Sequence, residues 1–217
     1  MARRASRSTA NFEARRAERR SGLTADGAYR ATIAQTAARL IAEHGITDWS
    51  FAKRKAAREL DLPARAALPH DEEIEDALRE YHELFGGEGH AATLRAQREE
   101  ALVWMERLAE FRPLLVGGVA QGWATEHSDI RIELTADDGK SVEIALLNDG
   151  CEYRALPMRS EDSPPELYVD TRRGGVRLTV RSYEGARQLP RRDRHGQGAQ
   201  RLTADAVRKL LATEKAG

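Results

Sequence analysis

The sequence has little of several features that define whole classes of protein. Cys151 is the only cysteine among 217 residues, which excludes an internal disulfide and favours a reducing compartment. No stretch approaches the roughly 20 apolar residues that cross a bilayer, and the N-terminus lacks the apolar centre of a signal peptide. We therefore expect a cytoplasmic protein that makes no membrane contact.

Motifs of several common enzyme classes are also absent. The chain has no Gly-x-x-x-x-Gly-Lys-Ser/Thr loop for ATP phosphates, no Cys-x-x-Cys or His-Glu-x-x-His zinc motif, and no nucleophile elbow. Phosphoryl transfer of the P-loop kind, zinc hydrolysis and serine-hydrolase chemistry therefore have no recognisable residues in this sequence.

Charge is balanced over the whole chain, with 35 basic and 35 acidic residues, but it is strongly segregated. Residues 3–20 carry a net charge of +5, residues 71–110 carry −8 and residues 187–201 carry +4. Residues 1–22 contain almost nothing to bury, so we expect a disordered basic tail. Because arginine-rich segments neutralise phosphates, a nucleotide or nucleic acid is a candidate partner of the tail and the later loop. A mere solubilising extension is the alternative.

Hydrophobic residues at helical spacing predict a helical region over residues 23–89. The expected helices run from Asp26 to Gly45, over 51–60 with Ser50 as the cap, from Asp71 to Gly86, and over about 91–111. Residues 29–60 also loosely resemble the opening of a Tet-repressor-type helix-turn-helix. Pro69 breaks any recognition helix that begins at Pro63, so we do not expect this segment to read DNA.

The second half of the chain mixes strand and helix signals. We expect strands over 114–116, from 128 to 134 and over 151–156, a helix within 140–148, a hairpin of strands near 167–169 and 176–183, and a last helix capped by Thr203.

The stretch LLVGGVAQGWATEHSDIRIEL, residues 114–134, is the most specific pattern in the chain. An apolar strand is followed by Gly117 and Gly118, then by a short polar segment, then by a strand that opens with Ser128 and Asp129. In order and spacing these residues resemble the signature of the nucleotidyltransferase fold, the DNA-polymerase-beta-like superfamily. The chain as a whole also resembles uncharacterised proteobacterial proteins that sometimes carry a UDP-N-acetylmuramate–alanine ligase label, which no motif here supports.

The resemblance implies an α+β protein with a helical N-terminal region, followed by a minimal nucleotidyltransferase-like mixed sheet with flanking helices. The expected divisions are the basic tail 1–22, the helical region 23–89 and the nucleotidyltransferase-like domain 90–217.

The resemblance also implies a catalytic chemistry, and the sequence departs from it. A nucleotidyltransferase binds two divalent metals on about three carboxylates, two of which lie two residues apart on one strand and so face the same way. Asp129 matches the first position, but Arg131 stands at the second, and residues 176–180 contain no acid for the third. We therefore expect a catalytically degenerate site. If activity survives, Asp129 and Glu133 are the candidate catalytic residues, with Asp129 as the ligand of Mg²⁺.

A phosphate-binding turn is the second implication. Backbone amides of Gly117 and Gly118 can receive an anion at the start of a helix, beside Ser128. Arg131 adds a planar guanidinium that can hold two phosphate oxygens without a metal. Three hypotheses follow: a non-catalytic module that binds a nucleotide or nucleic-acid phosphate in the remnant cleft, an active nucleotidyltransferase with an atypical carboxylate set, and a regulatory or interaction protein.

Overall fold

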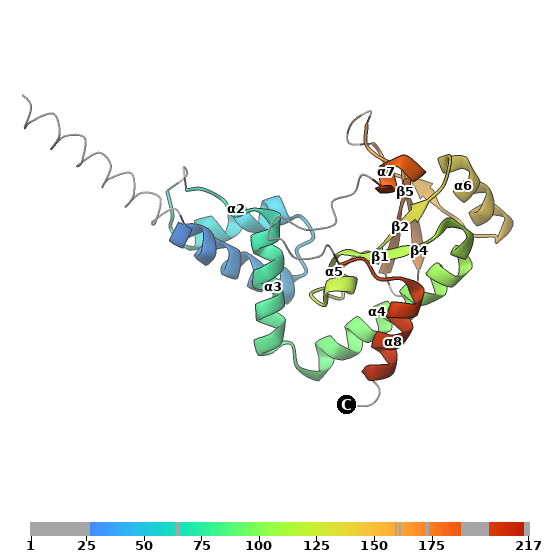
Figure 1. The fold of residues 1–217 in the computed structure, drawn as a ribbon. Coiled ribbons are helices and arrows are strands. Elements are labelled where there is room, and N and C mark those ends of the chain that lie inside the picture. The colour runs from blue at the N-terminus through green and yellow to red at the C-terminus, as the bar shows by residue number, and fades with distance from the viewer. Residues whose placement is uncertain are drawn as a thin grey trace, which may run out of the picture. The chain divides into compact units, whose positions relative to one another are not determined.

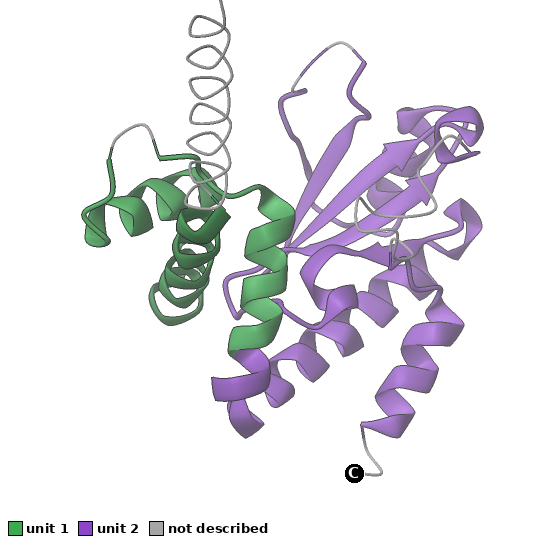
Figure 2. Ribbon diagram, turned by 60° about the vertical axis from the view of Figure 1, so that its left-hand side comes forward, with its two compact units in different colours: residues 1–81 green, residues 82–217 purple. Residues whose placement is uncertain are grey.

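A computed structural model describes residues 27–63, 66–158, 160, 162–171, 174–187 and 200–214. N-terminal helices are followed by a five-stranded mixed sheet with flanking helices, which confirms the expected α+β class (Figure 1). The chain divides into two compact units, residues 1–81 and 82–217, whereas the sequence analysis placed the division after residue 89 (Figure 2). The basic tail 1–22 lies outside the described residues.

The first unit is built from helices that bury small and branched apolar side chains. It comprises the helical residues 27–44, α2 (Trp49–Glu59) and most of α3 (Asp71–Phe85). Asp48, and not the predicted Ser50, caps α2, because its carboxylate accepts the amide of Phe51 at 3.0 Å. The buried apolar side chains of these helices are Ile33, Ala34, Ala37, Ala38, Leu40, Ile41, Ala52, Ala56, Ile74, Ala77 and Leu78.

The second unit carries the sheet. Its elements are α4 (Gly87–Arg107), the 3-10 turn η1 (Ala109–Phe111), β1 (Leu114–Val116), α5 (Gly117–Gln121), β2 (Ile130–Thr135), α6 (Gly139–Asn148), β3 (Arg154–Ala155), β4 (Glu166–Thr171), β5 (Gly174–Arg181), α7 (Tyr183–Arg187) and α8 (Ala204–Thr213). Thr203 caps α8 as predicted, and the expected strand over 151–156 is reduced to the two residues of β3.

The strands lie in the order β1-β2-β5-β4-β3. β2 is antiparallel to β1 and parallel to β5, while β4 is antiparallel to both β5 and β3. The parallel pairing sets Arg131 opposite Arg177 and Glu133 opposite Thr179. β2, between β1 and the central strand β5, therefore brings residues of the signature stretch next to residues that lie almost 50 positions later.

One face of the sheet forms the core of this unit. Ile130, Ile132 and Leu134 of β2 are at most 2% exposed and belong to one apolar cluster with side chains of α4, α6 and α8. Because side chains alternate along a strand, the intervening residues of β2 must lie on the opposite face. None of the described helices is long and apolar enough to cross a membrane.

Candidate anion-binding site

Charged residues cover the face of the sheet opposite the core, and most of them are paired. Asp129 precedes β2 in the same alternation as Arg131 and Glu133. The register of β5 adds Arg177 and Arg181 to this face. These five charged residues, which are scattered in the sequence, thus lie together on one face of the paired strands β2 and β5. Their contacts with one another decide what this face can bind.

Asp129 is held by a cation. Its carboxylate accepts a hydrogen bond from Arg177 at 2.9 Å and another from the hydroxyl of Tyr168 at 3.4 Å. Arg177 also donates to Glu166 at 3.1 Å. Burial lowers the pKa of Arg177, but hydrogen bonds to Asp129 and Glu166 outweigh it and raise that pKa above its ordinary value. Arg177 therefore stays charged and bridges two carboxylates.

Glu133 is held by two cations. It accepts two hydrogen bonds from Arg181, at 3.0 and 2.9 Å, and one from Arg201 at 3.1 Å, while only 12% of its side chain is exposed. Arg201 reaches this strand because the neighbouring Leu202 pairs with Leu115 of β1 through two backbone hydrogen bonds. Glu133 thus anchors the segment before α8 to the sheet.

These ion pairs do not fit a two-metal centre. At the place on β5 where a third carboxylate would be needed, the strand offers Arg177. A divalent ion about 5 Å from a guanidinium is repelled by roughly 7 kcal/mol at an effective dielectric constant near 20. Among the described residues there is also no group of three His, Cys, Asp or Glu placed to hold a metal. The chemistry of this donor set favours an anion over a cation.

The two glycines of the signature have packing roles. Gly117 has a φ of 69°, and a side chain there would lie 3.3 Å from the Cδ atom of Arg131. Gly118 lies under the ring of Trp123, 2.7 Å from where a Cβ would stand. The structure therefore brings Gly117 and Arg131 together, as the phosphate-site hypothesis requires, whereas Gly118 is needed for the tight corner itself.

Ser128 also serves the loop. Its hydroxyl accepts the amide of Thr125 at 3.0 Å, which closes the turn before β2. Ser128 therefore shapes the entry to the strand, and its hydroxyl is already used there.

A cavity of about 300 Å³ lies over the paired charges. Three arginines and two glutamates line it together with apolar side chains, which gives the lining a net charge of +1. The lining residues are Val116, Arg131, Glu133, Pro157, Met158, Ser163, Pro164, Glu166, Arg177, Thr179 and Arg181. Of the residues proposed from the sequence, Arg131 and Glu133 line this cavity, and Asp129 contacts it through Arg177.

Tyr168, Arg177 and Arg181 are site residues that the sequence analysis missed. Tyr168 lies across Gly175, where a Cβ would come within 1.9 Å of its hydroxyl, and Arg154 stacks on its ring at 4.3 Å. Burial, followed by the charge of Asp129, raises the pKa of Tyr168. The parallel register of β2 with β5 and the antiparallel register of β5 with β4 reveal these neighbours; the sequence signal was the pair of arginines, four residues apart, in the otherwise mostly apolar strand β5.

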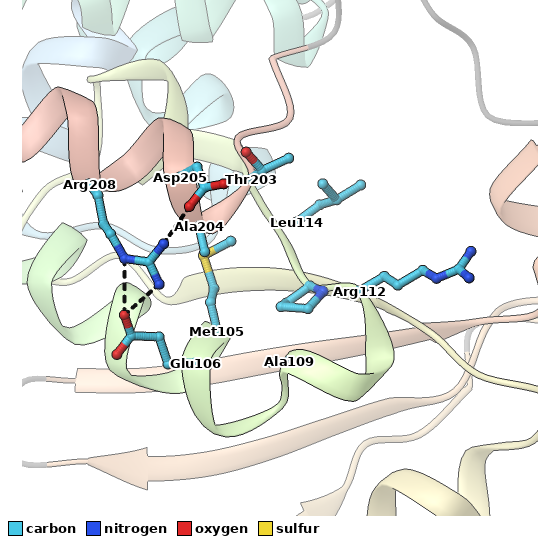
Figure 3. A pocket seen from close by; sticks show the side chains of 10 residues that line it. Met105, Glu106, Ala109, Arg112, Leu114, Thr203, Ala204, Asp205 and Arg208 are labelled. Atoms are coloured by element: carbon cyan, nitrogen blue, oxygen red, sulfur yellow. Dashed lines mark hydrogen bonds and ion pairs between the residues drawn. The ribbon is translucent and has the colours of Figure 1, made fainter.

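A larger cavity of about 510 Å³ lies between the end of α4 and the start of α8 (Figure 3). Its charged groups neutralise one another, because Arg208 binds Glu106 at 2.8 Å and also pairs with Asp205 (Figure 3). Its lining contains two arginines, Arg112 and Arg208, and two acids, Glu106 and Asp205, so it has no net charge. This cavity therefore lacks the electrostatic bias of the one on the sheet.

No protein-family model matches the chain, and no curated protein is significantly similar to it. The function must therefore be argued from the site itself.

Proposed function

We propose that the second unit is a catalytically degenerate nucleotidyltransferase-like domain that binds a phosphate-bearing ligand, a nucleotide or a short piece of nucleic acid. The observation that carries this proposal is the cavity lined by Arg131, Arg177 and Arg181, whose neighbouring carboxylates are already bound by arginine. We propose that this binding takes place in the cytoplasm.

The chemistry of the lining supports an anion with a phosphate. Guanidinium groups hold two phosphate oxygens at once, and they do so at any physiological pH. The buried Nε donor of Arg177 meets no acceptor among the described residues, so a ligand oxygen would reach it only after the neighbouring side chains move.

The size and the apolar wall of the cavity support a mononucleotide-sized ligand. About 300 Å³ is at the lower end of the range of small-molecule pockets, roughly 300–1,000 Å³. Pro157, Met158 and Pro164 give one side an apolar surface on which a base or sugar can pack, while the arginines lie on the strands. A longer nucleic acid would place one nucleotide there.

Calorimetric titration of ATP, GTP and a short RNA in excess chelator tests the proposal. Wild-type protein is expected to bind at least one of the three with micromolar to millimolar affinity, and added salt should weaken binding. Arg131→Ala should reduce the affinity about tenfold or more, the scale of one charge-assisted hydrogen-bond pair. Arg112→Ala is the matched control, since it removes the same charge from the other cavity.

Two outcomes would replace the proposal. Nucleotide transfer that needs Mg²⁺ and is abolished by Asp129→Ala would establish an active enzyme with an atypical carboxylate set. Absence of heat and of thermal shift with all three ligands would leave a regulatory or interaction protein.

A further inference from the structure

Helix α2 of the first unit presents a narrow basic stripe to solvent. At 100° per residue, positions 51, 54, 55 and 58 fall within about 100° of arc, which is one side of a helix. Phe51 is 43% exposed and Arg54 and Arg58 are exposed, with Lys55 half-buried between them. The residues of the opposite side, Ala52 and Ala56, are fully buried. We call Phe51, Arg54, Lys55 and Arg58 the α2 stripe.

The cations of the α2 stripe differ from every other described cation of this unit. Arg30, Arg39 and Arg79 each form an ion pair with a carboxylate, and Lys53 binds Asp71 at 2.6 Å. No such pair forms between the stripe and a described residue; Arg58 donates only to the backbone of Arg54, at 3.3 Å.

A shortage of acids does not explain this difference. The described part of residues 27–81 contains ten acidic residues against seven basic ones. The acids nevertheless pair elsewhere: Glu59, on the same helix, turns to Arg39 at 3.5 Å. Three cations without an ion pair to a described residue therefore lie together on a unit whose described residues are acidic overall. A local cluster of positive charge of this kind favours binding of a polyanion.

We infer that the α2 stripe binds single-stranded nucleic acid, with its cations on the phosphates and Phe51 stacked on a base. Cations that track a backbone beside an exposed aromatic ring are the usual platform for single strands. Positions 51 to 58 rise about 10 Å along the helix axis, enough for the three cations of the stripe to meet about three phosphates of a single strand.

An anionic membrane fits this helix less well. A helix that lies in a bilayer surface needs a continuous apolar face directed at the lipid. The apolar face of α2 is buried within its own unit, and Phe51 is the one apolar side chain in the stripe. The site is in the first unit, so this inference stands independently of the ligand of the second unit.

Fluorescence anisotropy with labelled U20 and dT20, measured on the full chain from 50 to 300 mM salt, tests the inference. The triple variant Arg54→Gln, Lys55→Gln, Arg58→Gln should bind at least tenfold more weakly at low salt. The slope of log affinity against log salt should lose about two units, the counterions released by three cations on a single strand. The triple control Lys140→Gln, Arg187→Gln, Lys209→Gln removes the same charge from the other unit and should change affinity less than twofold.

Phe51→Leu separates stacking from charge. It keeps an apolar side chain but removes the ring, and it should weaken U20 binding about tenfold without changing the salt slope. Circular dichroism at 222 nm should show the same helix content in all variants, since the replaced side chains are not part of the buried core. Unchanged binding in the α2 triple variant, an equal loss in the control, or binding to phosphatidylserine vesicles in place of U20 would overturn the inference.

Discussion

Glu133 accepts three hydrogen bonds from two arginines while its side chain is only 12% exposed. Glu133→Gln removes the charge and leaves Arg181 and Arg201 facing each other, so we expect it to destabilise the second unit by about 2–3 kcal/mol. Glu106→Gln breaks the exposed pair with Arg208 and should cost less than about 1 kcal/mol. Urea unfolding of both variants makes the comparison; equal midpoints would show that Glu133 does not anchor the sheet.

We expect His82 to make the second unit less stable in acid. Its ring stacks on that of His90 with centroids 3.7 Å apart, and burial, followed by the charge of His90, lowers the pKa of His82 from 6.5 to about 4. The unfolded chain therefore takes up this proton first. The stability that the neutral ring contributes is complete above about pH 6.5 and is lost as pH falls from there towards 4.

The half-buried ring limits the loss to about 1–2 kcal/mol after allowance for solvent screening. His82→Phe keeps the stack and should flatten the fall in stability between pH 7 and pH 4.5, whereas His44→Phe, at an exposed position, should leave the fall unchanged. The midpoints of urea unfolding, measured for each variant at several pH values between 7 and 4.5, give this fall in stability. An identical fall in His82→Phe and wild type would assign the acid sensitivity to other groups.

At the scale of elements, local signals located most helices and strands, but they could not supply their pairing. The cap at Thr203, the stop before Pro113 and the hairpin of β4 and β5 follow from residues within a few positions of each element. The parallel register of β2 and β5 joins segments almost 50 residues apart, so nothing local indicates that Arg177 meets Asp129. The sequence therefore predicted Asp129, Arg131 and Glu133 on one face of β2, but it did not predict the arginines that bind the two carboxylates.

The same register predicts how a metal site could be built on this face of the sheet. Arg131→Asp alone should not bind Mn²⁺, because Arg177 still holds Asp129 at 2.9 Å. Combined with Arg177→Asp, it places three carboxylates on adjacent strands, and the melting temperature of the double variant should then rise on addition of millimolar Mn²⁺. Wild type and the single variant should show no rise. A rise in the single variant would mean that Arg177 does not block the site.

At the scale of the molecule, the chain combines two units with different electrostatic surfaces. In the second unit Arg154, Arg177 and Arg181 of the sheet each pair with a carboxylate, and the described lining of the 300 Å³ cavity has a net charge of +1. In the first unit, whose described residues are acidic overall, the cations without a described ion pair are concentrated in the α2 stripe. Net charge of the whole chain, which is zero, conceals both surfaces, and this is why composition alone indicated no ligand.

The central claim is that the cavity on the sheet binds a phosphate-bearing ligand through arginines, without a metal. The most direct test is the dissociation constant of one nucleotide, measured by calorimetry on the full chain in 5 mM EDTA and again in 5 mM Mg²⁺. The account predicts constants that agree within about threefold, with EDTA giving the tighter value, because Mg²⁺ neutralises the phosphates that the arginines would otherwise bind. Binding that appears only with Mg²⁺ would contradict it.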